Sequence, residues 1–324
     1  MNISYFINYG IFSAFILLFL LEVGVGLLSL ISFGNYREKL MRYIVPVWEI
    51  NGTFGVFYVV NLEATYPSAV PLVGTIYVIP VILAITAFMA HNGYIAYAEY
   101  IGKPGQEALY MRIYGFSMLL VAFIAISMLT SSVSGISIDL KDGSINLVMM
   151  FANYFNILYF AGITLITVSV SMIFFEMKKP SKVLPIVFLL AAVALIAVAT
   201  LLYTPYIFAN FLQYLLYFVV VLAILLVSYI LYLKDYGIAS KVMVVLGTYS
   251  AVMYYGLLEY PYFFNGQVNA IELMNSSVMT EYINAITIIG GVLAAAFITV
   301  FVYFSYFENA PGEDYANLKN TGTQ

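Results

Sequence analysis

The sequence predicts an all-α, polytopic membrane protein with about nine transmembrane helices, its N-terminus outside and its C-terminus inside. Composition, the lengths of the apolar segments and the distribution of positive charge predict this fold class. Of 324 residues, 64% are apolar or aromatic and only 9% are charged. A soluble domain carries about 25% charged residues, because its surface faces water. Most of this surface therefore faces lipid, as in a multi-pass protein of the cell membrane.

Nine segments are long and apolar enough to cross a bilayer, which takes about 20 residues per helix. We expect them to form a single membrane domain over residues 1–308, followed by a polar cytoplasmic tail over 309–324. The first apolar run is too long for a signal peptide, so we expect it to be retained. The predicted helices are 8–33, 46–64, 70–98, 110–133, 146–176, 182–203, 207–233, 239–259 and 284–307.

Positive charge predicts the orientation. With the N-terminus outside, the predicted inner loops and tail hold 11 of the 12 lysines and arginines, and Lys141 alone lies outside. Cytoplasmic loops of membrane proteins carry such an excess of lysine and arginine. The opposite orientation would reverse the asymmetry.

The residue inventory excludes several kinds of chemistry. The sequence has no cysteine, which excludes disulfides, thiolate metal sites and cysteine nucleophiles. Its single histidine, His91, excludes a haem held by two histidines of this chain. No block of basic residues suggests a nucleic-acid partner. We therefore expect few catalytic groups and no bound cofactor or metal in the chain itself.

Two carboxylates lie well inside apolar segments. Glu49 is roughly 6 Å and Glu22 roughly 16 Å from the inner ends of their predicted helices, at about 1.5 Å per residue. Asn51 and His91 also fall in the inner half of the membrane. Together these four residues form a polar ladder that rises from the cytoplasmic side.

The ladder has two interpretations. Acids in hydrocarbon are costly and often mark proton pathways, so Glu49, Glu22, Asn51 and His91 are candidates for a proton entry route. Alternatively, each acid is neutral and hydrogen-bonded to a neighbouring helix for packing alone. A lone histidine is also more often a hydrogen-bonded structural residue than a ligand. Residue type and depth leave both interpretations open.

Two stretches near the N-terminus resemble the second subunit of cytochrome bd-type quinol oxidases. They are residues 21–28 (LEVGVGLL) and 42–51 (RYIVPVWEIN), and the similarity continues through 64–67 (ATYP), 260–262 (YPY) and 273–277 (LMNSS). The family begins with an acid-x-Gly-Val-Gly helix and opens its second helix with Pro-x-Trp-Asp-Gly-Asn. The sequence differs at Phe19, where the family has a second acid, and at Phe54, where it has a tryptophan. These differences indicate a divergent branch, which we expect to be archaeal.

The resemblance implies the haem-free second subunit of a quinol:oxygen oxidoreductase. Haem b and haem d would lie in subunit I, the principal partner, and small single-helix subunits, quinol, oxygen and lipids are further expected partners. A quinone or a structural lipid is a further candidate ligand of the chain. Carried over by position, Glu49 and Glu22 match acids of the family, whereas Trp48 and Phe54 would serve oxygen access or subunit packing.

Two other functions fit the polar ladder. A secondary transporter would use Glu22 and Glu49 to couple substrate movement to protons. A membrane anchor for another respiratory complex would need neither acid for chemistry. A histidine-rich, haem-bearing partner that co-purifies would distinguish the oxidase subunit from a transporter.

Overall fold

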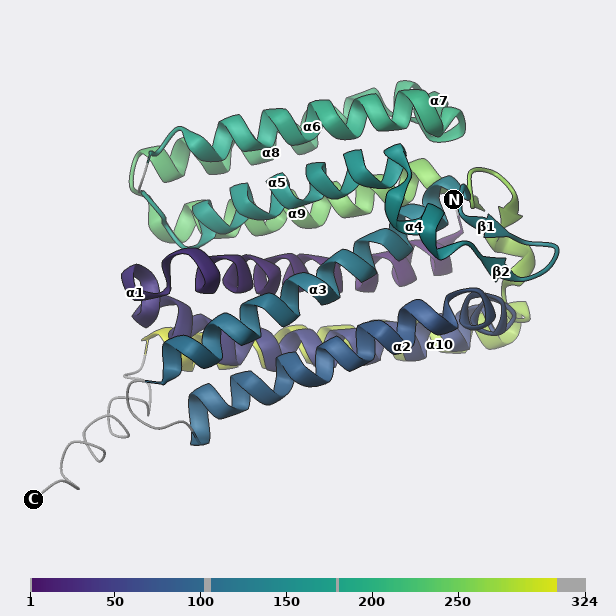
Figure 1. Cartoon of the computed structure of the whole chain (residues 1–324). Helices are drawn as coiled ribbons and strands as arrows, with labels where there is room; N and C mark the ends of the chain where they lie inside the picture. Colours follow the sequence, from purple (N-terminus) through teal and green to yellow (C-terminus); the bar gives the residue numbers. More distant parts are fainter. Residues whose placement is uncertain (1, 102–105, 179–180, 308–324) are drawn as a thin grey trace, which may run out of the picture. The chain divides into compact units, whose positions relative to one another are not determined.

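The computed structural model describes residues 2–101, 106–178 and 181–307. Most of these residues are helical (Figure 1). The all-α fold predicted from the sequence is therefore confirmed. The predicted polar tail, 309–324, lies outside the described residues. Contacts divide the chain into two units, Met1–Asn275 and Ser276–Gln324. Each unit is described by itself below.

Helix α1 (Ile3–Thr65) covers both of the first two predicted helices. A straight helix would hold Asn8 and Asn61 about 80 Å apart, but the Asn8 side chain donates to the Asn61 side chain at 2.8 Å. The helix therefore folds back on itself, and its two halves run side by side. The predicted loop between 33 and 46 was wrong, because helical hydrogen bonding continues through it. Between Gly34 and Pro46 no glycine or proline interrupts the helix, which explains the continuation.

The other helices of the first unit follow the predicted segments closely, with two corrections. The predicted helix 146–176 is divided at Asn153, whose extended backbone and side chain cap the second part through the Asn156 amide. The predicted helix 207–233 is divided at Tyr214. The elements are α2 (Ala69–Ala96), the π-helix η1 (Tyr97–Ile101), α3 (Glu107–Ser134), α4 (Leu147–Ala152), α5 (Tyr154–Phe174), α6 (Leu184–Tyr203), α7 (Pro205–Gln213), α8 (Leu215–Leu233) and α9 (Gly237–Glu259).

Two short antiparallel hairpins cover the end of this unit that also holds the N-terminus (Figure 1). Strand β1 (Ile138–Asp139) pairs with β2 (Ser144–Ile145). Strand β3 (Tyr262–Phe263) pairs with β4 (Val268–Asn269), which leads into the 3-10 helix η2 (Ala270–Leu273). We call this end the hairpin end. The turn of α1 and the α5–α6 and α8–α9 connections lie at the opposite end, which we call the charged end because its ion pairs include Arg37 with Glu107.

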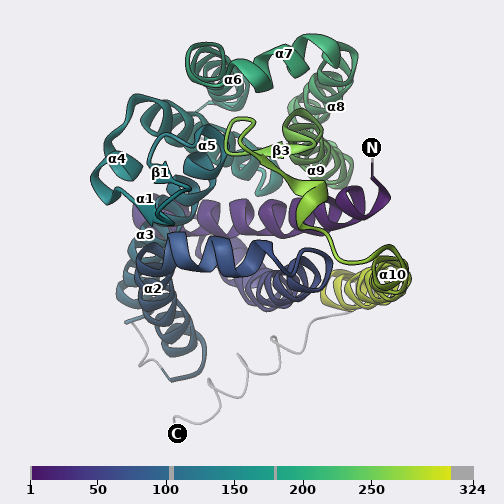
Figure 2. The ribbon, with the colours of Figure 1, turned by 90° about the vertical axis from the view of Figure 1, so that its right-hand side faces the viewer.

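The helices pack in layers, with α6 and α8 above α5 and α9, followed by α1 and α3 and then α2 (Figures 1 and 2). Burial follows this order. In their most apolar windows, 56% of the residues of α1 and of α3 are buried, against 22% in α6 and 17% in α8. The outer helices instead expose leucine, isoleucine and valine. Such exposure suits lipid, and α1 with α3 provides the interior where polar side chains gather.

Seven helices of the described residues are long and apolar enough to cross a membrane. They are the first half of α1, α3, α5, α6, α8, α9 and most of α2. In the second unit, α10 (Ser277–Phe307) includes a shorter apolar stretch, Ser277–Leu293. A multi-pass membrane protein is confirmed. The count of nine spans and the orientation stay predictions.

Candidate functional site

Three of the predicted ladder residues meet in the interior of the first unit. Glu22, on the first half of α1, is 1% exposed. Its Oε1 lies 2.8 Å from Nε2 of His91 on α2, and its Oε2 accepts a hydrogen bond from the side-chain amide of Asn51 on the second half of α1. We call Glu22, His91 and Asn51 the Glu22 network. Residues 29 and 69 positions from Glu22 in the sequence thus contact the two oxygens of one buried carboxyl.

Glycines beside Glu22 explain how so polar a group reaches the centre. A methyl group on Gly24 would lie 1.8 Å from the Ser171 hydroxyl of α5, and one on Gly26 would lie 3.1 Å from Met118 of α3. The α1 backbone therefore approaches α5 more closely than a side chain at residue 24 would permit, and it packs tightly on α3 at residue 26. Small residues at helix contacts commonly allow such a close approach in membrane proteins.

Aromatic rings enclose the histidine. The His91 ring stacks on Phe88 at 5.4 Å and lies 4.4 Å from the ring of Tyr114, measured between centroids. His91 and Tyr114 are both 0% exposed. Imidazole Nδ1, the Tyr114 hydroxyl and Asn51 Oδ1 have no hydrogen-bond partner among the described atoms. Buried polar atoms are normally hydrogen-bonded to protein or to ordered water, so these three atoms suit bound water beside the carboxyl.

The network has the chemistry of a proton carrier. The proton between His91 Nε2 and Glu22 Oε1 can reside on either atom, as a neutral acid–imidazole pair or as a carboxylate with imidazole N–H. Asn51 donates to the carboxyl in both states. Both oxygens of this buried carboxyl therefore have a polar partner wherever the shared proton resides.

Glu49, the other acid of the ladder, has its side chain outside the described residues, and only its backbone place in α1 is given. Its neighbour Trp48 donates from the indole N–H to the Asn92 side-chain carbonyl on α2, at 2.8 Å. This bond ties the second half of α1 to α2 one residue from His91.

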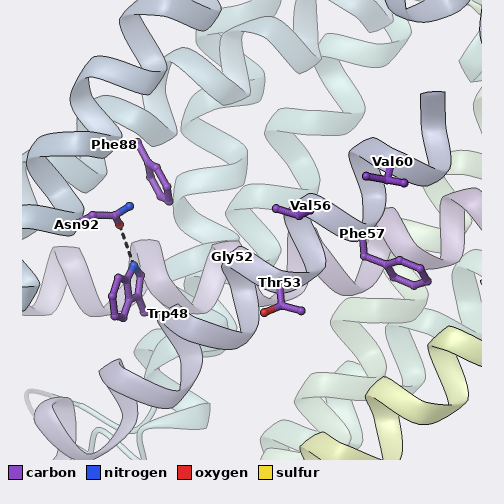
Figure 3. A pocket seen from close by; sticks show the side chains of 8 residues that line it. All are labelled: Trp48, Gly52, Thr53, Val56, Phe57, Val60, Phe88 and Asn92. Atoms are coloured by element: carbon purple, nitrogen blue, oxygen red, sulfur yellow. Dashed lines mark hydrogen bonds between the residues drawn. The ribbon is translucent and has the colours of Figure 1, made fainter. Parts of the chain in front are cut away.

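A groove of about 670 Å³ opens beside Trp48, between the second half of α1 and α2 (Figure 3). The lining side chains are mainly apolar, and Val56 and Val60 on its rim are 66% and 58% exposed. Phe54, the other residue predicted for oxygen access or packing, is half-buried and does not line the groove. The lining residues are Trp48, Gly52, Thr53, Val56, Phe57, Val60, Phe88 and Asn92.

Sequence reasoning missed Tyr114, Asn92 and the burial of Glu259. Tyr114 is one of 30 tyrosines, and nothing in its neighbourhood of the sequence distinguishes it. Glu259 ends the predicted helix 239–259, so its position in the sequence does not indicate a buried acid. It is the last residue of α9 but only 5% exposed, since tyrosines from other helices cover it.

The His91 ring has Phe88 and Tyr114 beside it, and its Nε2 is engaged by Glu22. No group of three histidines, cysteines or acids able to hold a metal occurs within the part of the chain that the structure describes. The described side chains therefore offer proton-carrying groups and an apolar groove.

Comparison with known proteins assigns the sequence to a family. A family model, described as cytochrome bd terminal oxidase subunit II, matches residues 2–307. Among solved structures, a chain of the bd oxidase from Geobacillus thermodenitrificans superposes with a TM-score of 0.78 at 18% identity, over 95% of this chain and 98% of that one. The search of curated proteins gave no match.

Proposed function

Because the chain belongs to the family of cytochrome bd terminal oxidase subunit II, we propose that it is the haem-free second subunit of a membrane quinol:oxygen oxidoreductase. Haem b and haem d would be held by subunit I. The environment of His91 supports the haem-free role, since the only histidine of the sequence is committed to Glu22. Quinol oxidation and oxygen reduction then take place in the partner, and this chain serves access to it.

Proton access is the first proposed role, and the Glu22 network is the observation that carries it. A carboxyl that is 1% exposed, bonded to imidazole and amide and beside three unsatisfied polar atoms, is better suited to proton transfer than to packing alone. Glu49 would deliver protons to this network from the cytoplasmic side. The order Glu49, Asn51, Glu22 and His91 is the proposed route.

Oxygen access is the second proposed role. Oxygen dissolves well in lipid, and the groove beside Trp48 is apolar and open on its rim. The Trp48–Asn92 hydrogen bond holds one wall in place. A quinone or structural lipid would suit the same groove, and Phe54, outside it, is the candidate for subunit packing.

The proposed orientation places the charged end in the cytoplasm. Arg37, Lys178 and Lys241 each form an ion pair there, whereas Lys141 follows β1 at the hairpin end. The positive-inside rule then places the hairpin end outside. With α10 and the second half of α1 counted, the chain would cross the membrane nine times.

Family membership favours the oxidase over a transporter or an anchor. The optical spectrum of the purified complex tests the choice, because an oxidase subunit co-purifies with a haem-bearing partner. Small single-helix subunits would appear in the same preparation. A chain that purifies alone and without haem absorption would contradict the proposal.

The proton role is tested by Glu49→Gln and Glu22→Gln, with Glu63→Gln, an exposed acid of the same helix, as the matched control. We expect oxygen consumption to fall at least about tenfold in the first two variants, by analogy with the loss of a general acid–base group. The haem spectrum and the control should stay unchanged. Full turnover in both variants across a range of pH would exclude the relay.

A further inference from the structure

A second buried carboxyl lies at the hairpin end of the first unit. Glu259 ends α9, and its Oε2 accepts a hydrogen bond from the Tyr9 hydroxyl of α1 at 3.1 Å. Among the described residues no lysine, arginine or histidine forms an ion pair with it. An ionised carboxylate without a counter-charge is costly in such surroundings.

Tyrosines from four helices surround this carboxyl. The Tyr159 hydroxyl donates a hydrogen bond to the Tyr255 hydroxyl at 3.2 Å. The tyrosines close enough to interact electrostatically with Glu259 are Tyr5, Tyr9, Tyr58, Tyr159, Tyr206 and Tyr255. We call Glu259 and these six residues the Glu259 cage.

The cage adjoins the molecular surface at the hairpin end. Tyr260 follows Glu259 directly, and its hydroxyl accepts a hydrogen bond from the backbone N–H of Asn2 at 3.0 Å. The backbone carbonyl of Tyr260 accepts a hydrogen bond from the Tyr206 hydroxyl at 2.8 Å. By contrast, Tyr9 and Glu22 lie 13 positions apart on α1, about 20 Å along the helix. The cage is therefore near one face of the membrane and far from the Glu22 network.

We propose that Glu259, with the hydroxyl of Tyr9, is a proton-exchange site for the membrane face at which the hairpins lie. The neutral acid releases a proton to water at that face, and the remaining carboxylate keeps the hydrogen bond from Tyr9. The reverse step takes the proton back. Hydroxyls are the groups that face the carboxyl from α1, α5, α7 and α9, so no neighbouring cation shares the charge. The site does not depend on the oxidase assignment.

Infrared spectroscopy of the whole complex tests this site directly. Sealed vesicles with uniformly oriented protein are held under flowing buffer, so that pH changes on one face only. The C=O band of a protonated carboxylic acid is followed in the wild type, in Glu259→Gln and in Tyr9→Phe. Glu63→Gln and Tyr262→Phe serve as controls, because Glu63 is exposed and the part-exposed Tyr262 has no hydrogen bond to the carboxyl.

We expect a band that is absent in Glu259→Gln, present in both controls, and lost when pH rises at the hairpin face. In Tyr9→Phe the midpoint of that loss should move up by about one pH unit, because a charge-assisted hydrogen bond to the carboxylate is gone. A band that is missing, or that responds only to the opposite face, would overturn the proposal. Should Glu259→Gln fail to assemble, an unchanged midpoint in Tyr9→Phe would overturn it as well.

Discussion

The Glu22 network and the Glu259 cage bury the same functional group among different neighbours. Glu22 is 1% exposed and Glu259 is 5% exposed, so burial alone does not separate them. Glu22 has an imidazole and an amide on its two oxygens. For Glu259 the described contact is one tyrosine hydroxyl at 3.1 Å.

The difference shows that partners, more than depth, determine what a buried acid can do. Within the Glu22 network an imidazole nitrogen and a side-chain amide each contact one carboxyl oxygen, so both oxygens have a polar partner. The Glu259 cage has no imidazole or amide among its described contacts, and its proton must go to water at the nearby surface. The Glu22 network therefore suits proton transfer inward through the protein, and the Glu259 cage suits proton exchange at a single membrane face.

The largest expected effect is that of His91→Leu. Removing the imidazole leaves Oε1 of a buried carboxyl without its hydrogen-bond partner, which costs about 3 kcal/mol of the free energy of unfolding, since Glu22 would face apolar groups there. Denaturation of the purified complex in detergent measures this. Combining His91→Leu with Glu22→Gln should recover about 1 kcal/mol or more through their coupling; additive effects would mean that the two side chains do not interact.

The same substitution at the two acids should give different results. Glu22→Gln should cost about 2 kcal/mol, because both hydrogen bonds to the carboxyl change and one hydrogen bond contributes about 1 kcal/mol. Glu259→Gln should cost less than about 1 kcal/mol, since a glutamine side chain still accepts the bond from Tyr9. Equal losses in both variants would erase the distinction between the two regions.

Alanine substitutions at two tightly packed glycines should each cost about 2 kcal/mol of the free energy of unfolding. A methyl group on Gly115 would lie 2.4 Å from the Gly26 carbonyl oxygen, a backbone atom beside the Glu22 network. One on Gly256 would lie 2.3 Å from the Tyr9 ring, and would displace that ring from Glu259. Gly93→Ala is the control, because nothing lies within 4 Å of its added methyl. Thermal denaturation should show a lower midpoint for Gly115→Ala and for Gly256→Ala, and an unchanged midpoint for Gly93→Ala.

The smallest effect is expected at Asp235, an exposed acid of the charged end. Hydrogen bonds from Lys178 and Lys182 hold the pKa of its carboxyl below the usual value of 3.8. A folded-state pKa below the unfolded one gives stabilisation that is present above that usual value and is lost as pH falls through the folded pKa. Asp235→Asn should therefore narrow the difference in thermal midpoint between pH 6 and about pH 3, slightly and less at high salt. A change as large as that of His91→Leu would contradict this account.

The sequence predicted the fold class and most helix positions, because apolar length is a local property. It did not predict that helical hydrogen bonding would continue through the turn of α1, or that α5 would begin again at Asn153. Where a helix continues or begins again depends on single capping residues and on contacts with other helices. Glu22, Asn51 and His91 were selected by type and depth, and the structure brings them together. Glu259 was not selected, because its burial comes from tyrosines of α1, α5 and α7 that no local pattern connects to it.

Proton uptake during the reaction of the fully reduced complex with oxygen reports on the Glu22 network itself. A pH-sensitive dye follows uptake after oxygen is mixed with wild type and with Glu22→Gln. If the Glu22 network supplies protons to subunit I, uptake in the variant should slow by about tenfold or more, with an unchanged haem spectrum. Uptake at the wild-type rate in a fully assembled Glu22→Gln complex would contradict the proposed proton role of the network.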